Sequence, residues 1–234
     1  MKSLLAFLVL AVFLVSCAPS YQVSHYGDRA DGPPITESLF TDKSATISEE
    51  NIQKILDGAY KTPRQLRVAI LHLDGPKRNY NWYIWGDEAY LRTRQAFLDS
   101  FTSQFKQSPR IAKMMAIPDL LISQSQPTLT TIRESAVRMQ ADIVVAYAIN
   151  SDIYTKYRGF KKPDIKAYAT TQLIIMDVRT GLVPFSTIVT RDFLTMKKKE
   201  ELDITEARNN VQTQAVLLTI NEIGRQVTEY LKAE

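Results

Sequence analysis

The sequence predicts one α/β domain whose mixed, partly parallel sheet is flanked by helices. Between residues 66 and 149, apolar β-rich runs alternate with segments of helical periodicity. That alternation is typical of parallel strands joined by right-handed helical crossovers. Two β-rich runs then follow each other across a short turn, which indicates an antiparallel hairpin. The expected order is therefore βαβαβ, a long β-hairpin and a C-terminal helix.

The folded part is expected to open with a short helix. Ser48 stands where an N-cap belongs, and Ile52, Ile55 and Leu56 recur at helical spacing. Gly58 then stands where a helix commonly ends. Regular structure should thus begin at about Ser48.

Two strand-and-helix units are expected next. The segment 66–73, "LRVAILHL", predicts a buried strand, and 87–105 predicts a helix. The same order repeats as a strand around 110–117, a helix over 128–139 and a strand, "DIVVAYAI", over 142–149. The expected helix 87–105 carries five large apolar side chains on or near one face: Leu91, Phe97, Leu98, Phe101 and Phe105.

The hairpin and the last helix complete the domain. The strands 165–178 and 182–196 are joined at Arg179-Thr180-Gly181, where glycine permits a positive φ. Asp203 or Thr205 can cap the final helix. The side chains expected to face the sheet from it are Val211, Ala215, Leu218, Ile223, Val227 and Leu231.

The amino terminus predicts export and a lipid anchor. Lys2 precedes an apolar run, Leu4 to Val15, that is short for a permanent membrane span and reads as a signal peptide. Its end, Leu14-Val15-Ser16-Cys17, resembles the bacterial lipoprotein signal, which implies acyl chains such as palmitate on Cys17. Cys17 is the one cysteine of the chain, so it cannot form an internal disulfide. An ordinary secretory signal cut nearby is the alternative.

These features divide the chain into three parts. Residues 1–16 are the expected lipoprotein signal peptide, 17–46 a lipid-anchored tether and 47–234 the single domain. The tether is polar, lacks a strand or helix period, and as a coil reaches roughly 30 Å. In the bacterial lipoproteins that this signal resembles, an aspartate after the cysteine tends to retain the protein on the inner membrane. Ala18 stands there instead, which implies the periplasmic face of the outer membrane in a two-membrane cell.

The domain itself resembles a group of envelope proteins. The segments "RVAILHLD", "ADIVVAYAI" and "LIIMDVRTG" carry this resemblance, which covers about 65–232. The group includes curli secretion channel subunits, lipoprotein activators of penicillin-binding proteins and the amino-terminal domain of the Tol translocation protein. The resemblance implies binding or assembly with partners rather than catalysis.

Two stretches are candidate partner-binding sites. The first, "RNYNWYIWGDEAY" at 78–90, follows the first strand, where open α/β sheets bind ligands. Alternatively, its rings cover an end of the core or contact a neighbouring subunit. Its candidate binding residues are Tyr80, Trp82, Tyr83 and Trp85.

The second stretch, at 154–166, interleaves aromatic and basic residues and suits anionic headgroups or acidic envelope partners. The alternative is a solvated hairpin whose lysines prevent edge-to-edge aggregation. Its candidate binding residues are Lys156, Arg158, Lys161 and Lys162, with Tyr154, Tyr157 and Lys166 beside them and Lys197, Lys198 and Lys199 joining if the strand ends lie close.

Catalytic and cofactor chemistry has little support in the sequence. His25 and His72 pair with no recognisable nucleophile motif, and two histidines make a zinc site improbable. The eight glycines form no phosphate-binding motif. We therefore expect no enzyme activity, no catalytic residues, no metal and no cofactor. A glycan or peptidoglycan hydrolase using Asp74, Asp87 or Glu88 is one alternative.

The predicted function is that of a non-enzymatic, lipid-anchored envelope protein. It would bind an envelope protein or peptidoglycan, in activation of a cell-wall enzyme or in a trafficking complex. The net charge of +4 is modest, and an exported chain seldom meets nucleic acid, so no nucleic-acid partner is expected. A subunit of an oligomeric secretion channel is a further alternative. Homo-oligomerisation is left open.

Overall fold

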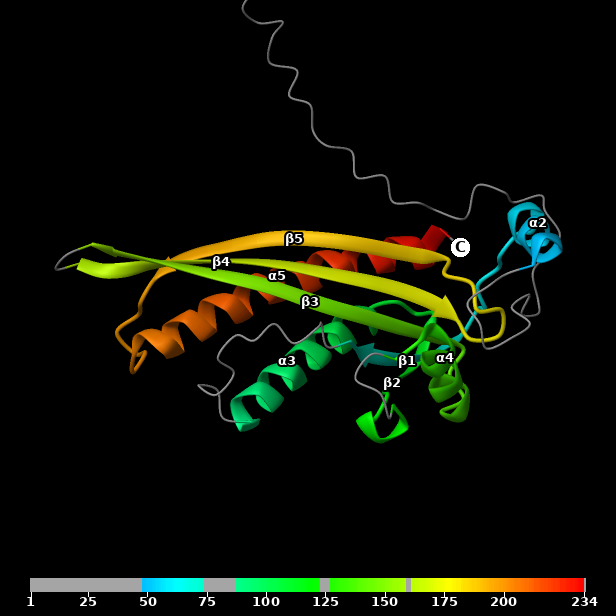
Figure 1. The fold of residues 1–234 in the computed structure, drawn as a ribbon, viewed down its shortest axis with the longest axis horizontal. Helices are drawn as coiled ribbons and strands as arrows, with labels where there is room; N and C mark the ends of the chain where they lie inside the picture. Colours follow the sequence, from blue (N-terminus) through cyan, green and yellow to red (C-terminus); the bar gives the residue numbers. More distant parts are fainter. Residues whose placement is uncertain (1–47, 74–86, 123–126, 159–160, 234) are drawn as a thin grey trace, which may run out of the picture.

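The computed structural model describes residues 48–73, 87–122, 127–158 and 161–233, in which helices flank one five-stranded sheet (Figure 1). The strand order across the sheet is β2-β1-β3-β4-β5. In chain order the elements are α2 (Glu49–Asp57), β1 (Leu66–His72), α3 (Asp87–Phe105), β2 (Ile111–Ala116), the 3-10 turn η4 (Asp119–Leu121), α4 (Leu129–Arg138), β3 (Ile143–Arg158), β4 (Lys161–Asp177), β5 (Phe185–Met196) and α5 (Ile204–Ala233).

The sheet is mixed, as the sequence predicts. Strand β1 pairs in parallel with both β2 and β3, whereas β4 is antiparallel to both β3 and β5. The parallel strands β2, β1 and β3 therefore form one half of the strand order, where helices connect them. The antiparallel strands β3, β4 and β5 form the other half, where hairpins connect them. The predicted fold class is confirmed.

Side-chain oxygens cap the helices at the places where the sequence puts them. Ser48, Thr128 and Asp203 each accept a hydrogen bond from the backbone N–H three residues on, at 3.3, 3.2 and 2.8 Å. Of the two candidates for the last cap, Asp203 fills the position and Thr205 lies inside α5. Gly181 has a φ of 78° in the β4–β5 turn, a conformation that glycine adopts without steric cost.

The hairpin strands are longer than the sequence indicated. Strand β3 runs for 16 residues and β4 for 17, so the segment 151–165 extends both strands instead of forming a separate short hairpin. Tyr154 is paired with Lys166 in this extension, and Lys156 with Asp164. The extension was not predicted because most of its outward-facing residues are polar. The sequence after Ile149 therefore lacks the continuous apolar run by which the first part of the strand was recognised. The result is a hairpin that protrudes at one end of the molecule (Figure 1).

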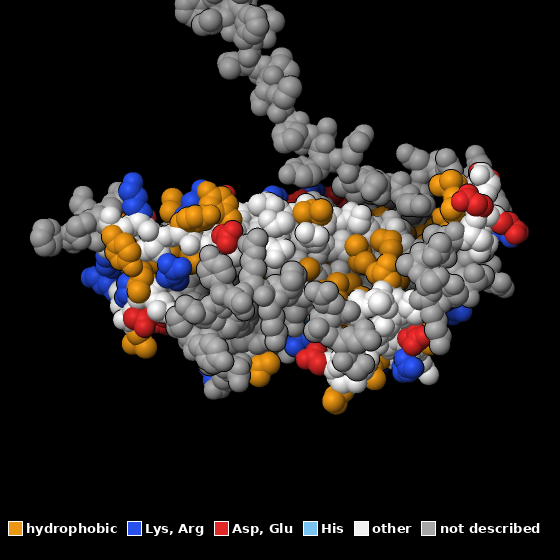
Figure 2. Space-filling model, in the orientation of Figure 1, with side chains coloured by type: hydrophobic (Ala, Val, Ile, Leu, Met, Phe, Trp, Pro, Cys, Tyr) orange, Lys and Arg blue, Asp and Glu red, His pale blue; other side chains and the backbone are white. Residues whose placement is uncertain are grey.

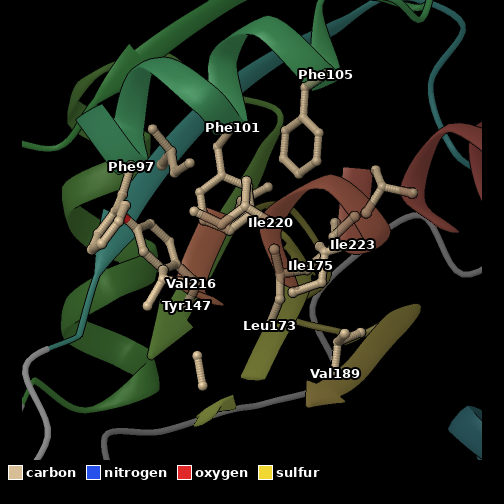
Figure 3. Close-up of a cluster of buried hydrophobic side chains, with 14 of the residues drawn as sticks. Phe97, Phe101, Phe105, Tyr147, Leu173, Ile175, Val189, Val216, Ile220 and Ile223 are labelled. Atoms are coloured by element: carbon tan, nitrogen blue, oxygen red, sulfur yellow. The ribbon is translucent and has the colours of Figure 1, made fainter. Parts of the chain in front are cut away.

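The main core lies between the sheet and the helices α3 and α5. Figure 3 shows Phe97, Phe101 and Phe105 of α3 turned toward side chains of α5 and the strands. The Phe101 ring lies 4.5 Å from the ring of Tyr147, centroid to centroid. Burying each such aromatic side chain contributes roughly 2–3 kcal/mol, so this layer dominates the stability of the fold.

The predicted core faces are largely correct, with two exceptions. Phe97, Phe101 and Phe105 are buried, but Leu91 of α3 is 56% exposed. In α5, Leu218 is 39% exposed because the buried stripe of that long helix passes through its neighbours Val216 and Ile220. The other five predicted α5 positions are buried: Val211, Ala215, Ile223, Val227 and Leu231.

The opposite side of the sheet is covered over only part of its length. Helix α4 packs there through Ile132 and Ala136 against a second cluster that includes Leu71, Val144 and Met176. Among the described residues, no helix covers the remaining part of β3, β4 and β5 on this side. We call that uncovered side of the three antiparallel strands the outer face.

Gly224 of α5 lies against Gln104 of α3. A Cβ atom at that position would lie 2.5 Å from Cβ of Gln104 and 2.8 Å from its Cγ. Contacts that short do not occur in real structures, so any larger residue must push the two helices apart. Gly224 thus sets the spacing of the helix layer beneath the sheet.

Replacing Gly224 by alanine is expected to destabilise the domain. Alanine usually favours a helix interior over glycine by about 1 kcal/mol, but overpacking costs about 1–3 kcal/mol. We expect a lower free energy of unfolding in urea. Adding Gln104→Gly should restore it, whereas Gln104→Ala, which keeps the clashing Cβ, should not. Equal stability of Gly224→Ala and the parent chain would contradict this account.

Candidate functional site

The outer face carries large apolar side chains in contact with solvent. Along β4 and β5, odd-numbered side chains face α5 and even-numbered ones face outward, as burial of Ile175 and Val189 on the inside shows. The outward positions include Tyr168, 41% exposed, and Leu194, 61% exposed. Tyr154 of β3 joins them at 60%. A gathering of exposed apolar groups on one face makes that face the candidate site.

Two tyrosines and a lysine form the most structured part of this face. The rings of Tyr154 and Tyr168 stand nearly perpendicular, with centroids 5.9 Å apart and an interplanar angle of 85°. The Nζ atom of Lys166 lies 4.6 Å from the centroid of the Tyr168 ring. Together these three side chains line an open hollow of about 580 Å³. Such amphipathic groups can contact both apolar and anionic parts of a partner.

An ion pair fixes the lysine of the hollow. Lys166 Nζ lies 2.8 Å from Oδ2 of Asp192 on the neighbouring strand β5. The hydrogen bond from Lys166 lowers the pKa of the Asp192 carboxyl, and the same bond raises the pKa of Lys166. Lys166 therefore remains cationic at physiological pH, and its ammonium group is held beside the Tyr168 ring.

Further lysines gather where the hairpin ends. Lys156 and Lys162 are exposed on the protruding β3–β4 hairpin. Arg158 and Lys161 are paired across its end, and their side chains lie outside the described part of the chain. Figure 2 shows Lys and Arg side chains beside hydrophobic ones at this end of the molecule, on the left. We call Tyr154, Lys156, Lys162, Lys166 and Tyr168 the hairpin surface.

The structure also brings the lysine run 197–199 to this end. The backbone N–H of Lys197 donates to the carbonyl of Pro163 at 3.4 Å, so the end of β5 adjoins the start of β4. This meets the condition under which the run was expected to join the basic stretch. The binding role of these lysines stays a prediction.

Glu201, which the sequence analysis missed, holds the loop that carries those lysines. Its buried carboxylate accepts hydrogen bonds from Nδ2 of Asn210 at 3.1 Å and from the N–H of Lys198 at 2.6 Å. These contacts, led by the one from Asn210, lower its pKa. The sequence alone does not distinguish Glu201 from the neighbouring Glu200, so the burial of its carboxylate could not be predicted.

Tyr168 and the exposed apolar side chains of β5 were likewise not predicted as site residues. The segment 185–196 has apolar residues at both odd and even positions, for example Val189 inward and Ile188 outward. A strand with one solvated face normally alternates apolar and polar residues. That departure was the available sign in the sequence that both faces of β5 carry apolar side chains.

Several predicted site residues cannot be placed. Cys17 and the aromatic residues Tyr80, Trp82, Tyr83 and Trp85 lie outside the described residues, as does Asp74. The side chains of Asp87 and Glu88 are likewise not described, although both residues belong to α3. The aromatic loop and the lipid anchor therefore stay predictions.

The described ranges also bear on whether the chain has a histidine site, a metal site or a membrane span. His72 is half-buried in β1, where its ring stacks on Tyr147 with centroids 4.9 Å apart. Across the described ranges, no three His, Cys, Asp or Glu residues gather as metal ligands would. None of the helices described is both long and apolar enough to span a bilayer.

No protein-family model matches the sequence, and no curated protein matches it either. Solved structures do resemble the fold. A hypothetical protein from Chlamydia trachomatis shares 15% identity at a TM-score of 0.45, covering 73% of this chain and 99% of its own.

Two further structures resemble the fold. A minor lipoprotein from Acinetobacter baumannii shares 7% identity at a TM-score of 0.32, covering 71% of this chain and 92% of its own. The C-terminal domain of LpoB from Salmonella enterica shares 14% at a TM-score of 0.28, covering 56% and 84%. The structures similar to this chain thus include a lipoprotein, and the similarity concerns the fold alone.

Removing the lysine of the hollow should raise the pKa of its partner. In Lys166→Met the Asp192 carboxyl loses its main hydrogen bond, so its pKa should return toward the ordinary value, as followed by NMR titration of the carboxyl carbon. A depressed folded-state pKa stabilises the protein above the ordinary carboxyl pKa, and this stabilisation is lost as pH falls through the folded value. Lys156→Met is the matched control and should leave Asp192 unchanged. An unaltered Asp192 titration in Lys166→Met would refute the assignment.

Proposed function

We propose that this chain is a non-enzymatic, lipid-anchored protein of the bacterial cell envelope that binds another envelope component through the hairpin surface. The observation that supports it most directly is the pair of exposed tyrosines with a fixed lysine beside the Tyr168 ring, on the side of the strands that faces away from α5. Catalysis by contrast would need a constellation of polar groups around a reacting atom, and the hollow contains one lysine already paired with Asp192.

The rigidity of the hairpin surface suits it to binding. Its side chains stand on paired β-strands, and the inner side of those strands packs on α5, so little backbone entropy is lost when a partner docks. Tyrosine supplies contact area with few rotatable bonds, and desolvated aromatic anchors carry much of the energy of protein interfaces. The exposed lysines Lys156 and Lys162 at the rim favour a partner with an acidic surface.

The predicted anchor would make a weak contact effective. Acyl chains on Cys17 confine the domain to a membrane surface, where the local concentration of a neighbouring partner is high. Figure 1 shows α2, where the described chain begins, and the protruding hairpin at opposite ends of the molecule. An anchored chain can thus present the hairpin surface away from its point of attachment. The outer membrane, on its periplasmic face, is the proposed location.

The anchor has a direct test. Mass spectrometry of the membrane fraction should find acyl chains on Cys17, and Cys17→Ala should release the chain or mislocalise it. Two acyl chains suffice for stable attachment, because each buried methylene contributes about 0.8 kcal/mol. Cys17→Ala should keep the thermal unfolding midpoint of the domain, which separates loss of anchoring from loss of folding. An unmodified mature chain in the soluble fraction would contradict the proposal.

The docking role predicts a charge-sensitive partner contact. A photo-crosslinking residue at Tyr154 in intact envelopes should capture one specific partner. Lys156→Glu with Lys162→Glu should weaken that capture by about tenfold or more, equivalent to about 1.4 kcal/mol, because both charges at the rim are reversed. The matched control, Lys106→Glu with Lys113→Glu, makes the same charge change on α3–β2 residues and should have little effect. Equal capture by both double variants would remove the hairpin surface from consideration.

A further inference from the structure

Strand β5 forms one edge of the sheet. It pairs with β4 along 12 residues from Phe185 to Met196, and no strand of the described chain pairs with its other side. Twelve residues is long for an edge strand, since most strands have five or six. An open edge of that length is a template for pairing with another strand.

The register shows which backbone groups point away from the sheet. The N–H of Lys197 donates to the carbonyl of Pro163 across the β4–β5 ladder, and Val178 donates to Asp142 across β3–β4. Since these bonds alternate along a strand, odd-numbered residues of β5 bond β4 and even-numbered residues point outward. The residues whose backbone N–H and C=O groups point away from β4 are Ser186, Ile188, Thr190, Asp192, Leu194 and Met196.

The same residues carry their side chains on the outer face. Ile188 is 58% exposed, Leu194 61% and Met196 58%, so the open edge is also apolar. One contact partly protects the edge: Nη1 of Arg191 donates a hydrogen bond to the outward carbonyl of Thr190 at 3.0 Å. Proline and bulges, which protect many natural edges, do not occur between Phe185 and Met196.

We propose that a second copy of this chain pairs with β5 in an antiparallel arrangement, about a two-fold axis at Arg191. In that register Ile188 of each copy lies opposite Leu194 of the other, and Thr190 lies opposite Asp192. Six opposed pairs then exchange roughly twelve backbone hydrogen bonds, two for each pair. The exposed apolar side chains of one edge become the cross-strand partners of the other.

The neighbouring registers are less favourable. An axis at Asp192 places that carboxylate, which Lys166 pairs at 2.8 Å, directly opposite its own copy, and it leaves Leu194 opposite the polar Thr190. An axis at Thr190 sets Ile188 against Asp192 and Leu194 against Ser186. The axis at Arg191 sets the two branched aliphatic side chains Ile188 and Leu194 against each other, whereas the axis at Asp192 sets Ile188 against Met196 and Leu194 against Thr190.

The inner face of the proposed pairing is also compatible. Val189 of one copy lies opposite Phe193 of the other, and the two Arg191 side chains lie directly opposite each other. Their repulsion is offset because each guanidinium lies 3.5 Å from the carboxylate of Glu222 in its own chain. The two copies then form one continuous sheet in which both hairpin surfaces lie on the same side. This pairing does not rest on the proposed function.

Cysteine pairs test the register in native envelopes. Copies with Ile188→Cys and copies with Leu194→Cys, carrying different tags, should form a disulfide when expressed together, because opposed Cα atoms lie about 5.5 Å apart. Each variant alone should give only the background of the parent chain, because identical positions lie about 20 Å apart at roughly 3.4 Å per residue. Crosslinking of Ile188→Cys alone, or none in the mixture, would overturn the pairing.

A matched pair of substitutions tests the edge itself. Thr190→Pro and Thr190→Ala both lose the hydroxyl that lies 2.9 Å from the Thr170 hydroxyl, but only proline removes the outward N–H. Proline is tolerated there because that N–H makes no bond within the sheet. In sedimentation equilibrium of the full chain in detergent micelles, Thr190→Ala should dimerise as the parent does and Thr190→Pro at least tenfold more weakly. Comparable dimerisation of both variants, or a monomeric parent, refutes the proposal. Matching thermal midpoints confirm that both fold.

Discussion

One-sided burial of the long antiparallel strands is the constraint on which the rest of the structure depends. Helix α5 runs for 30 residues beneath β3, β4 and β5, and α3 packs beside it. A buried hydrogen bond between the hydroxyls of Thr171 and Thr219, 2.6 Å long, ties β4 to α5 inside this layer. Since α4 covers only one end of the other side, around Val144 and Met176, the even-numbered residues beyond that end, such as Tyr154, Tyr168 and Leu194, face solvent. The outer face follows from this unequal distribution of helices.

The register of β5 must be held firmly for that arrangement to work, because a slip of one residue would exchange its two faces. The start of the strand is set by the β4–β5 turn, where Asp177 accepts hydrogen bonds from the N–H and hydroxyl of Thr180. Tyr60, which follows α2, donates to the same carboxylate at 3.1 Å. At the other end, Glu201 ties the loop after β5 to α5. Two buried carboxylates thus fix both ends of the edge strand.

Much of this could be predicted from the sequence because it is local. Ser48, Thr128 and Gly181 occupy positions that only a few residue types fill, so caps and turns are recognisable in a single chain. The apolar runs around β1 and the helical period of Phe97, Phe101 and Phe105 are equally local. What could not be predicted depends on contacts distant in sequence. The length of β3 beyond Ile149 depends on α5 beneath it, and the tyrosine hollow exists because Tyr154 and Tyr168 are diagonal neighbours on paired strands.

The composition of the outer face explains why its contacts should be weak and reversible. Polar groups there are already paired with one another, as Lys166 is with Asp192 and Thr170 with Thr190. A partner therefore gains apolar contact with the tyrosines without having to satisfy buried unpaired charges, and surfaces that remain folded and soluble alone are usually of this mixed kind. Such a surface gives modest affinity in solution. Attachment to a membrane multiplies it through local concentration, and a second copy on the same sheet would multiply it again, since both hairpin surfaces would meet the partner together.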